Sequence, residues 1–192
     1  MKIYSCLPII LVFAVCGSMR CKKSENGVVT PPADANLMAN GSFEINGVAT
    51  LQGWSSNDGD TSYVNFSNDT PSGGGSYSVR LKNGWTVRST IWYSLKPPIG
   101  THRYQLSVWA KAMRSNALVE AGGDVSLMTR TGGASSLHKY IHFADTMWTT
   151  GSVIDTLTTS STDSVVITLR GNIDQSSAGY VLFDLCRFEK LD

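Results

Sequence analysis

The sequence has little charge, and the charge that it has is balanced. Charged residues make up 16% of the 192 residues and the formal net charge is +1, whereas an average soluble domain has roughly 25% charged residues. A nucleic-acid-binding surface needs a concentrated basic patch. The composition therefore argues against a nucleic-acid partner, and it also disfavours a multi-span membrane protein and a helical bundle.

The common catalytic motifs are absent as well. The sequence contains no CxxC pair, no HExxH, no GxSxG and no phosphate-binding loop, which carry metal, nucleophilic and phosphate chemistry. His138 and His142 are four residues apart, a spacing that suits a shared metal only on a helix. On a strand the same two residues stand about 13 Å apart. We therefore predict a protein without catalytic residues.

Apolar and polar residues alternate in short segments from residue 36 onward. We find no helical stripe of ten or more residues, and clusters of Gly, Asn, Asp and Pro separate the segments. Short strands with regular turn signals predict an all-β fold, an antiparallel β-sandwich or jelly roll, over residues 36–192. The clearest strand segments are 76–82, 89–95, 103–112, 125–129, 139–143, 152–157, 164–170 and 179–188.

The alternation also assigns faces to the predicted strands. In segment 103–112 the apolar residues Tyr104, Leu106, Val108 and Ala110 share one face, so Trp109 lies on the other. In segment 89–95 the inward residues leave Trp92 facing outward. Since only residues 96–102 separate these segments, we expect the two strands to pair and the two indoles to lie roughly 5 to 8 Å apart.

The first 21 residues have the pattern of an export signal. Lys2 precedes a short apolar run at 7–15, which is too short to cross a bilayer. Cysteines follow at positions 16 and 21, and the stretch that begins at Cys21 resembles the mature start of Bacteroides-group lipoproteins. We expect a lipoprotein signal peptide at 1–21, a flexible Pro-containing tether at 22–35 and a lipid anchor in the outer membrane, on the cell surface or the periplasmic face.

Which cysteine would carry the lipid stays open. Cys21 is slightly favoured, although Arg20 precedes it where a small residue is usual, and Cys16 is the alternative. If Cys21 is lipidated, Cys186 is left without a disulfide partner. If Cys16 is the anchor, a bridge between Cys21 and Cys186 becomes formally possible. We expect Cys186 to be a small buried residue of a strand.

Four segments in order resemble a known family. The opening Asn40-Gly41-Ser42-Phe43-Glu44, followed by Gly53-Trp54, is similar to the start of carbohydrate-binding modules of the family 4, 9 and 22 type, which are galactose-binding-like jelly rolls. The likeness continues through 76–81, 104–111 and 179–185. It covers most of residues 36–188 and implies a jelly roll that binds glycan. Relatives of this fold also serve as assembly subunits, so an accessory role that docks an outer-membrane protein is the alternative.

The resemblance also implies a structural calcium ion. In the family a glutamate of the opening motif and an aspartate of the last strand help to hold Ca²⁺, and Glu44 and Asp184 match these positions. A hard cation takes oxygen ligands, so carboxylates from both ends of the chain would join those ends. The alternative is that Glu44 caps backbone donors and Asp184 pairs with a nearby cation.

The residues expected to touch glycan are the outward aromatic and polar side chains. Two exposed indoles on one sheet face would make a platform for the apolar face of a sugar ring. Packing under a loop is the alternative for each of them, and Trp54, Trp148 and Tyr63 are expected to pack in the core or under loops. The candidate ligand-binding residues are Trp92, Trp109, Gln105, Lys111, Arg80 and Trp85.

Overall fold

The structure is a computed structural model that describes residues 36–57, 63–82, 89–113, 122–172 and 179–192. Within these ranges every regular element is a β-strand. No helix of the described residues is long and apolar enough to cross a membrane. The predicted signal peptide and tether, both candidate lipidation sites (Cys16 and Cys21) and Trp85 lie outside the described residues.

The described residues form twelve strands, and the eight predicted segments all recur among them. The segments match β5 to β12, whereas the short strands β1 to β4 were not predicted. The bounds are β1 (Glu44–Ile45), β2 (Val48–Ala49), β3 (Trp54–Ser56), β4 (Val64–Ser67), β5 (Ser78–Lys82), β6 (Thr90–Leu95), β7 (Gly100–Met113), β8 (Gly123–Thr131), β9 (Ala134–Phe143), β10 (Thr149–Thr159), β11 (Ser164–Gly171) and β12 (Tyr180–Lys190).

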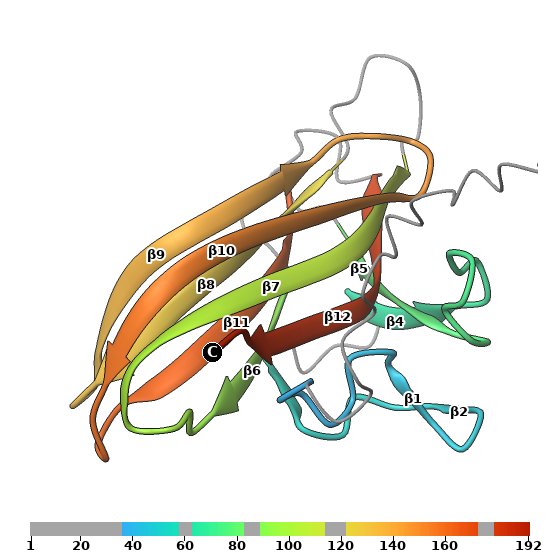
Figure 1. Cartoon of the computed structure of the whole chain (residues 1–192). Coiled ribbons are helices and arrows are strands. Elements are labelled where there is room, and N and C mark those ends of the chain that lie inside the picture. The colour runs from blue at the N-terminus through green and yellow to red at the C-terminus, as the bar shows by residue number, and fades with distance from the viewer. Residues whose placement is uncertain (1–35, 58–62, 83–88, 114–121, 173–178) are drawn as a thin grey trace, which may run out of the picture. The chain divides into compact units, whose positions relative to one another are not determined.

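Ten of these strands form two antiparallel sheets that face each other (Figure 1). Sheet 1 has the order β10-β7-β12-β5-β4, and sheet 2 has the order β3-β6-β11-β8-β9. The long strands β9 and β10 lie side by side at one edge of the sandwich. Strands β1 and β2 form a separate hairpin. The predicted all-β sandwich is confirmed.

The core lies between the two sheets and follows from the alternation. In β7 the residues Tyr104, Leu106 and Val108 are fully buried, while their neighbours in the chain are partly or fully exposed. Sheet 2 supplies the facing residues Val165, Ile167 and Leu169 of β11. Because successive side chains of a strand point to opposite faces, burying one set fixes the other set on the outside.

The expectation that β6 and β7 pair is wrong. β6 pairs with β3 and β11 in sheet 2, whereas β7 pairs with β10 and β12 in sheet 1. The connection crosses from one sheet to the other through Pro97 and Pro98. Two adjacent prolines remove the backbone donors that a hairpin ladder needs. The Lys96 ammonium donates to the carbonyls of Thr162 and Asp163 (3.2 and 3.1 Å), which holds this crossover.

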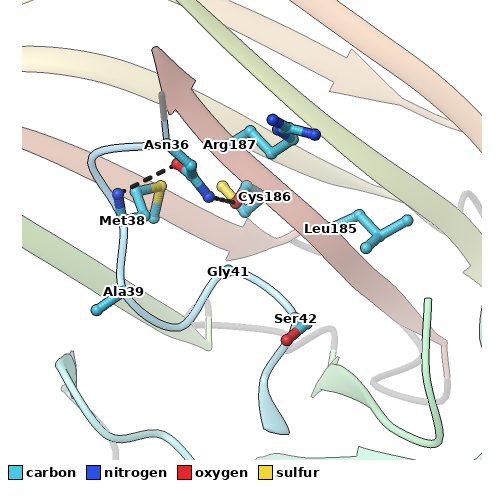
Figure 2. A pocket seen from close by; sticks show the side chains of 8 residues that line it. All are labelled: Asn36, Met38, Ala39, Gly41, Ser42, Leu185, Cys186 and Arg187. Atoms are coloured by element: carbon cyan, nitrogen blue, oxygen red, sulfur yellow. Dashed lines mark hydrogen bonds between the residues drawn. The ribbon is translucent and has the colours of Figure 1, made fainter. Parts of the chain in front are cut away.

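The N-terminal segment is held on β12 at a bulge (Figure 2). The Asn36 side chain accepts hydrogen bonds from the amides of Met38 (3.1 Å) and Phe188 (2.9 Å) and donates to the Cys186 carbonyl (3.5 Å). Cys186 is buried, as predicted for a small strand residue, and no described cysteine pairs with it. A Cβ at Gly41 would overlap the Cys186 carbonyl, so the close crossing explains the glycine of the opening motif.

Candidate functional site

The predicted glycan residues do not form one site. Trp109, Gln105 and Lys111 lie on β7 and Arg80 lies on β5, all on the outer face of sheet 1. Trp92 lies on β6, on the outer face of sheet 2. Both indoles point away from the core, as predicted. They stand on opposite sides of the sandwich, however, so the two-indole platform is wrong.

On sheet 1 the segment between β4 and β5 already engages Lys111, one of the predicted polar residues. The Lys111 ammonium lies 2.6 Å from the Asp69 carboxylate, and the Trp148 indole N–H donates to the same carboxylate at 2.8 Å. Burial opposes ionisation of Asp69, but the hydrogen bonds from Lys111 and Trp148 outweigh it and lower its pKa. Lys111 therefore serves a structural ion pair on this face.

Arg80 and Gln105 also have neighbours on the outer face of sheet 1. The Arg80 guanidinium lies 4.3 Å from the centre of the Tyr180 ring, which is cation–π geometry. Gln105 lies between Ile154 of β10 and Glu189 of β12 in the register. Trp109 lies in register with the buried Asp184. Lys111 and Arg80 are thus engaged within the protein, whereas Ile154 beside Gln105 is 43% exposed.

Glu44 and Asp184, the predicted calcium ligands, come together beneath the same segment. A Cβ at Gly74 would overlap the Asp184 carboxylate, and a Cβ at Gly75 would overlap that of Glu44. The Ser76 amide donates to Glu44 Oε2 at 2.9 Å, as the capping alternative expected. Asp184 Oδ1 accepts from the Leu185 amide at 2.7 Å, whereas its Oδ2 is buried without a partner.

The charge of this pair has no cation among the described residues to balance it. Burial, together with the nearby Glu44 carboxylate, raises the pKa of Asp184 to about 7 although the Leu185 amide opposes the shift. No described cluster of three or more His, Cys, Asp or Glu side chains forms a metal site. A cation here would take two carboxylates and complete its shell with carbonyl oxygens or water. The orphaned Oδ2 and the glycine-lined space fit a hard cation such as Ca²⁺.

The outer face of sheet 2 carries an open groove around Trp92, named here the sheet-2 groove. Its volume of about 250 Å³ is below the roughly 300–1,000 Å³ of pockets that enclose a small molecule. One row of cross-strand neighbours runs across sheet 2. It begins at Trp92 of β6 and continues through Thr168 of β11 and Ser126 of β8 to Tyr140 of β9. The groove is lined by Thr90, Trp92, Met128, Arg130, Ser135, Val166, Thr168 and Arg170.

The row from Trp92 to Tyr140 combines aromatic ends with polar groups between them. Three strand spacings separate the two aromatic residues, about 14 Å. Ser126 is only 4% exposed and its hydroxyl has no partner in the part of the chain that the structure describes. Leu137 and Tyr140 of the adjoining β9 are 59% and 66% exposed. The Ser126 hydroxyl is buried, so what this face offers to a ligand is the exposed surface of Leu137 and Tyr140 beside the groove.

The sequence prediction missed most of this groove. Only Trp92 was named as a binding residue. Alternation places Thr168 and Arg170 outward and could have found them, because Val165, Ile167 and Leu169 form a plain core face. Alternation also places Tyr140 outward, because Ile141 and Phe143 pack on the core, but no local pattern places Tyr140 on the same sheet as Trp92.

No protein-family model and no curated protein matches the chain. Among solved structures, the chain is similar to the enzymatically active domain of bacteriophage CBA120 tailspike protein 4, with a TM-score of 0.60 and 16% identity. The alignment covers 82% of this chain and 22% of the tailspike chain, so this chain spans about a fifth of that protein.

Two further similar structures are carbohydrate-binding modules. Family 16 Carbohydrate Binding Module-2 aligns with a TM-score of 0.54 and 19% identity over 75% of this chain and 96% of the module. The CBM22-1 xylan-binding domain of Paenibacillus barcinonensis Xyn10C aligns with a TM-score of 0.55 and 15% identity over 82% and 95%. At these identities the likeness is one of fold, and it confirms the predicted jelly-roll sandwich.

Proposed function

We propose that this protein binds glycan, without catalysis, through the sheet-2 groove. The observation that carries the proposal is the arrangement on the outer face of sheet 2, where Trp92 borders an open groove that Arg130, Ser135 and Arg170 also line, and where Tyr140 is exposed three strands away. The jelly-roll fold that the protein shares with carbohydrate-binding modules supports this choice.

The physical basis is the two-sided character of a sugar ring. One face of the ring is apolar and stacks on an aromatic side chain, while its rim carries hydroxyl groups that need hydrogen-bond partners. Trp92 and Tyr140 supply aromatic surface, and the side chains of Arg130, Ser135 and Arg170 line the groove and can bond to the sugar hydroxyl groups. An open groove accepts a chain that continues at both ends, so a polysaccharide fits it better than a free monosaccharide.

The test is a glycan array with the purified protein, followed by affinity electrophoresis on the glycans that it retains. Trp92→Ala and Tyr140→Ala are each expected to weaken retention by about five- to tenfold, because each removes one stacking contact. Trp109→Ala is the matched control, since it removes the same type of side chain from the opposite sheet, and it should leave retention unchanged. Retention that depends on Trp109 and not on Trp92 would contradict the proposal.

We also propose that Glu44 and Asp184 hold a structural Ca²⁺ ion. Both carboxylates lie against the glycines of the segment between β4 and β5, and Asp184 Oδ2 lacks a partner. The ion would supply positive charge that the described residues do not bring to this pair. The two residues would then join the opening hairpin to the last strand, and so the beginning of the domain to its end.

The cellular setting that we propose is a lipid anchor in the outer membrane, at Cys21 or Cys16. The short apolar run, the two cysteines and the Pro-containing tether support it. Replacing both cysteines with serine should release the protein into the soluble fraction and remove the acyl mass. A double variant that stays membrane-bound with unchanged mass would contradict the anchor.

Docking to an outer-membrane protein is the second candidate function. It is favoured by one observation: Leu137 and Tyr140 are exposed on β9, which is the edge strand of sheet 2. Edge strands with apolar side chains are common places for protein contacts. If no glycan is retained and the protein co-purifies with a membrane partner at fixed stoichiometry, and Tyr140→Ala abolishes this association, docking replaces glycan binding.

A further inference from the structure

We propose that the sheet-2 groove selects anionic glycans, which carry carboxylate or sulfate groups on their sugars. The inference rests on the proposed glycan binding and names the class of ligand for the same groove. Its basis is a pair of arginines, Arg130 of β8 and Arg170 of β11, that line the groove together with Trp92.

The two arginines lie near opposite ends of the groove. Arg130 lies opposite Ser164 of β11 in the register, and Ser164 is six residues from Arg170 on the same strand. Six residues of a strand span about 20 Å. Met128 and Val166 lie between them on the same outer face. A chain of sugars lying along β11 would therefore meet apolar surface in the middle and a guanidinium group near each end.

Neither arginine has a carboxylate partner among the described residues, since no ion pair joins either of them to an acid. None of the residues that line the groove is acidic. Asp124 lies in register with Arg170, but its carboxylate is 2.7 Å from His142 Nδ1. The positive charge of the groove is thus left for a ligand.

Three basic side chains of sheet 1 interact with partners within the protein. Lys111 pairs with Asp69, Arg187 pairs with Glu189 at 2.5 Å, and Arg80 lies over the Tyr180 ring. Arg103 of sheet 1 also lacks an ion-pair partner among the described residues, so what distinguishes the groove is that two such guanidinium groups line one hollow. A guanidinium group binds carboxylate and sulfate groups through paired hydrogen bonds, and Arg170 is half-buried, which strengthens such contacts.

The experiment is affinity electrophoresis of the full chain in gels that contain polygalacturonate, its methyl ester or dextran sulfate. The methyl ester keeps the sugar chain and removes its charge. We expect retention by polygalacturonate, dextran sulfate or both, little retention by the methyl ester, and weakening by added NaCl. Arg130→Gln and Arg170→Gln should each weaken retention about fivefold, and Arg170→Lys less.

Arg103→Gln is the matched control, because Arg103 is an exposed arginine on the outer face of sheet 1. It makes the same change in net charge and should leave retention unaltered. Retention of the acid but not of dextran sulfate would identify carboxylate as the recognised group, and the reverse would identify sulfate. Both results support the inference.

Three other results would overturn it. Equal retention of polygalacturonate and its methyl ester, with both sensitive to Trp92→Ala, would leave glycan binding intact and remove the preference for charge. A further gel contains polyglutamate, a polyanion without sugars. If polyglutamate retains the protein as strongly as polygalacturonate does, and Trp92→Ala does not weaken this retention, the surface binds any polyanion. Failure to retain any neutral or acidic glycan on the array would remove the proposed function together with the inference.

Discussion

The outer faces of the two sheets carry similar residues in different surroundings. Each has an outward tryptophan, Trp109 on sheet 1 and Trp92 on sheet 2, with basic residues nearby. On sheet 1 the segment between β4 and β5 brings Asp69 to Lys111 and packs against Asp184. On sheet 2 the region around Trp92 is a groove whose arginines have no described acid partner.

This difference shows that outward direction does not make a binding site. Trp92 and Trp109 are equally outward by alternation, yet the segment folded over sheet 1 gives that face a structural use. A side chain in a structural contact is expected to affect stability, whereas one that borders an open groove is expected to affect ligand retention. Measurements of stability and of glycan retention on variants of the two faces therefore separate these two roles.

Removal of calcium is expected to destabilise the sheet-1 face most. A ligand that binds only the folded state contributes about 2.7 kcal/mol to the unfolding free energy at a hundredfold excess over its Kd. Chelation should therefore lower the melting temperature by about 5 to 10 °C for a domain of this size. Thermal melts with EDTA and with added CaCl₂ measure the difference.

Glu44→Gln is expected to lose this calcium response, because it removes one of the two carboxylates. Asp155→Asn is the matched control, since Asp155 lies on β10 and pairs with His138 instead. Its melting temperature should still fall on chelation. A native protein whose melt is the same in EDTA and in excess calcium would show that the Glu44–Asp184 pair holds no ion.

The calcium-free protein is expected to lose stability as the pH rises from about 4 to about 7. Burial first, and then the Glu44 charge, raises the pKa of Asp184 to about 7 in the folded state, above the roughly 3.9 of an unfolded chain. Between these values the folded state keeps a proton that the unfolded chain has released, so unfolding becomes easier with rising pH. The expected loss is on the order of 2 kcal/mol, measured by urea unfolding in EDTA at pH 5 and pH 8.

Asp184→Asn isolates this effect, because the amide is neutral at both pH values. Every other titratable group is the same in the native protein and in the variant. The difference between the native protein and the variant therefore reports Asp184 alone. If the two proteins have the same pH dependence, Asp184 is not the source.

Lys111→Met is expected to have the smallest effect, a loss of about 1 kcal/mol or less in the unfolding free energy. It removes the ion pair with Asp69 while keeping an apolar side chain of similar length. The effect is small because the Lys111 and Asp69 side chains are 20% and 38% exposed, so solvent screens their attraction. Chemical denaturation measures the loss, and glycan retention should not change. A variant of unchanged stability that retains glycan poorly would move the binding site to sheet 1.

The sequence was sufficient for the strands and for their inner and outer faces. The eight predicted segments correspond to β5 to β12, and Tyr104, Leu106 and Val108 are buried as the alternation requires. The sequence was not sufficient to predict which strands pair with each other. The short distance between β6 and β7 in the chain suggested pairing, and the adjacent Pro97 and Pro98 were the overlooked sign that the chain leaves the sheet there.

The sequence likewise predicted some residues of the candidate site and missed others. The resemblance in the opening motif and the last strand pointed to Glu44 and Asp184, and the fold brings them beneath the same segment. Trp92 was named for the right face of its strand but with the wrong neighbours. Tyr140 and Ser126 were not named, because their place beside Trp92 depends on the order β6-β11-β8-β9.

The sequence by itself determined which side of each strand is buried, because the two-residue period of a strand is a local property of the backbone. The tertiary structure alone decided which outward residues share a face and which of those faces is covered. Strand order comes from contacts between segments far apart in the chain, and no local pattern records it. Trp109 therefore lies beside Asp184. Trp92 lies on the same row as Ser126, with Thr168 of β11 between them.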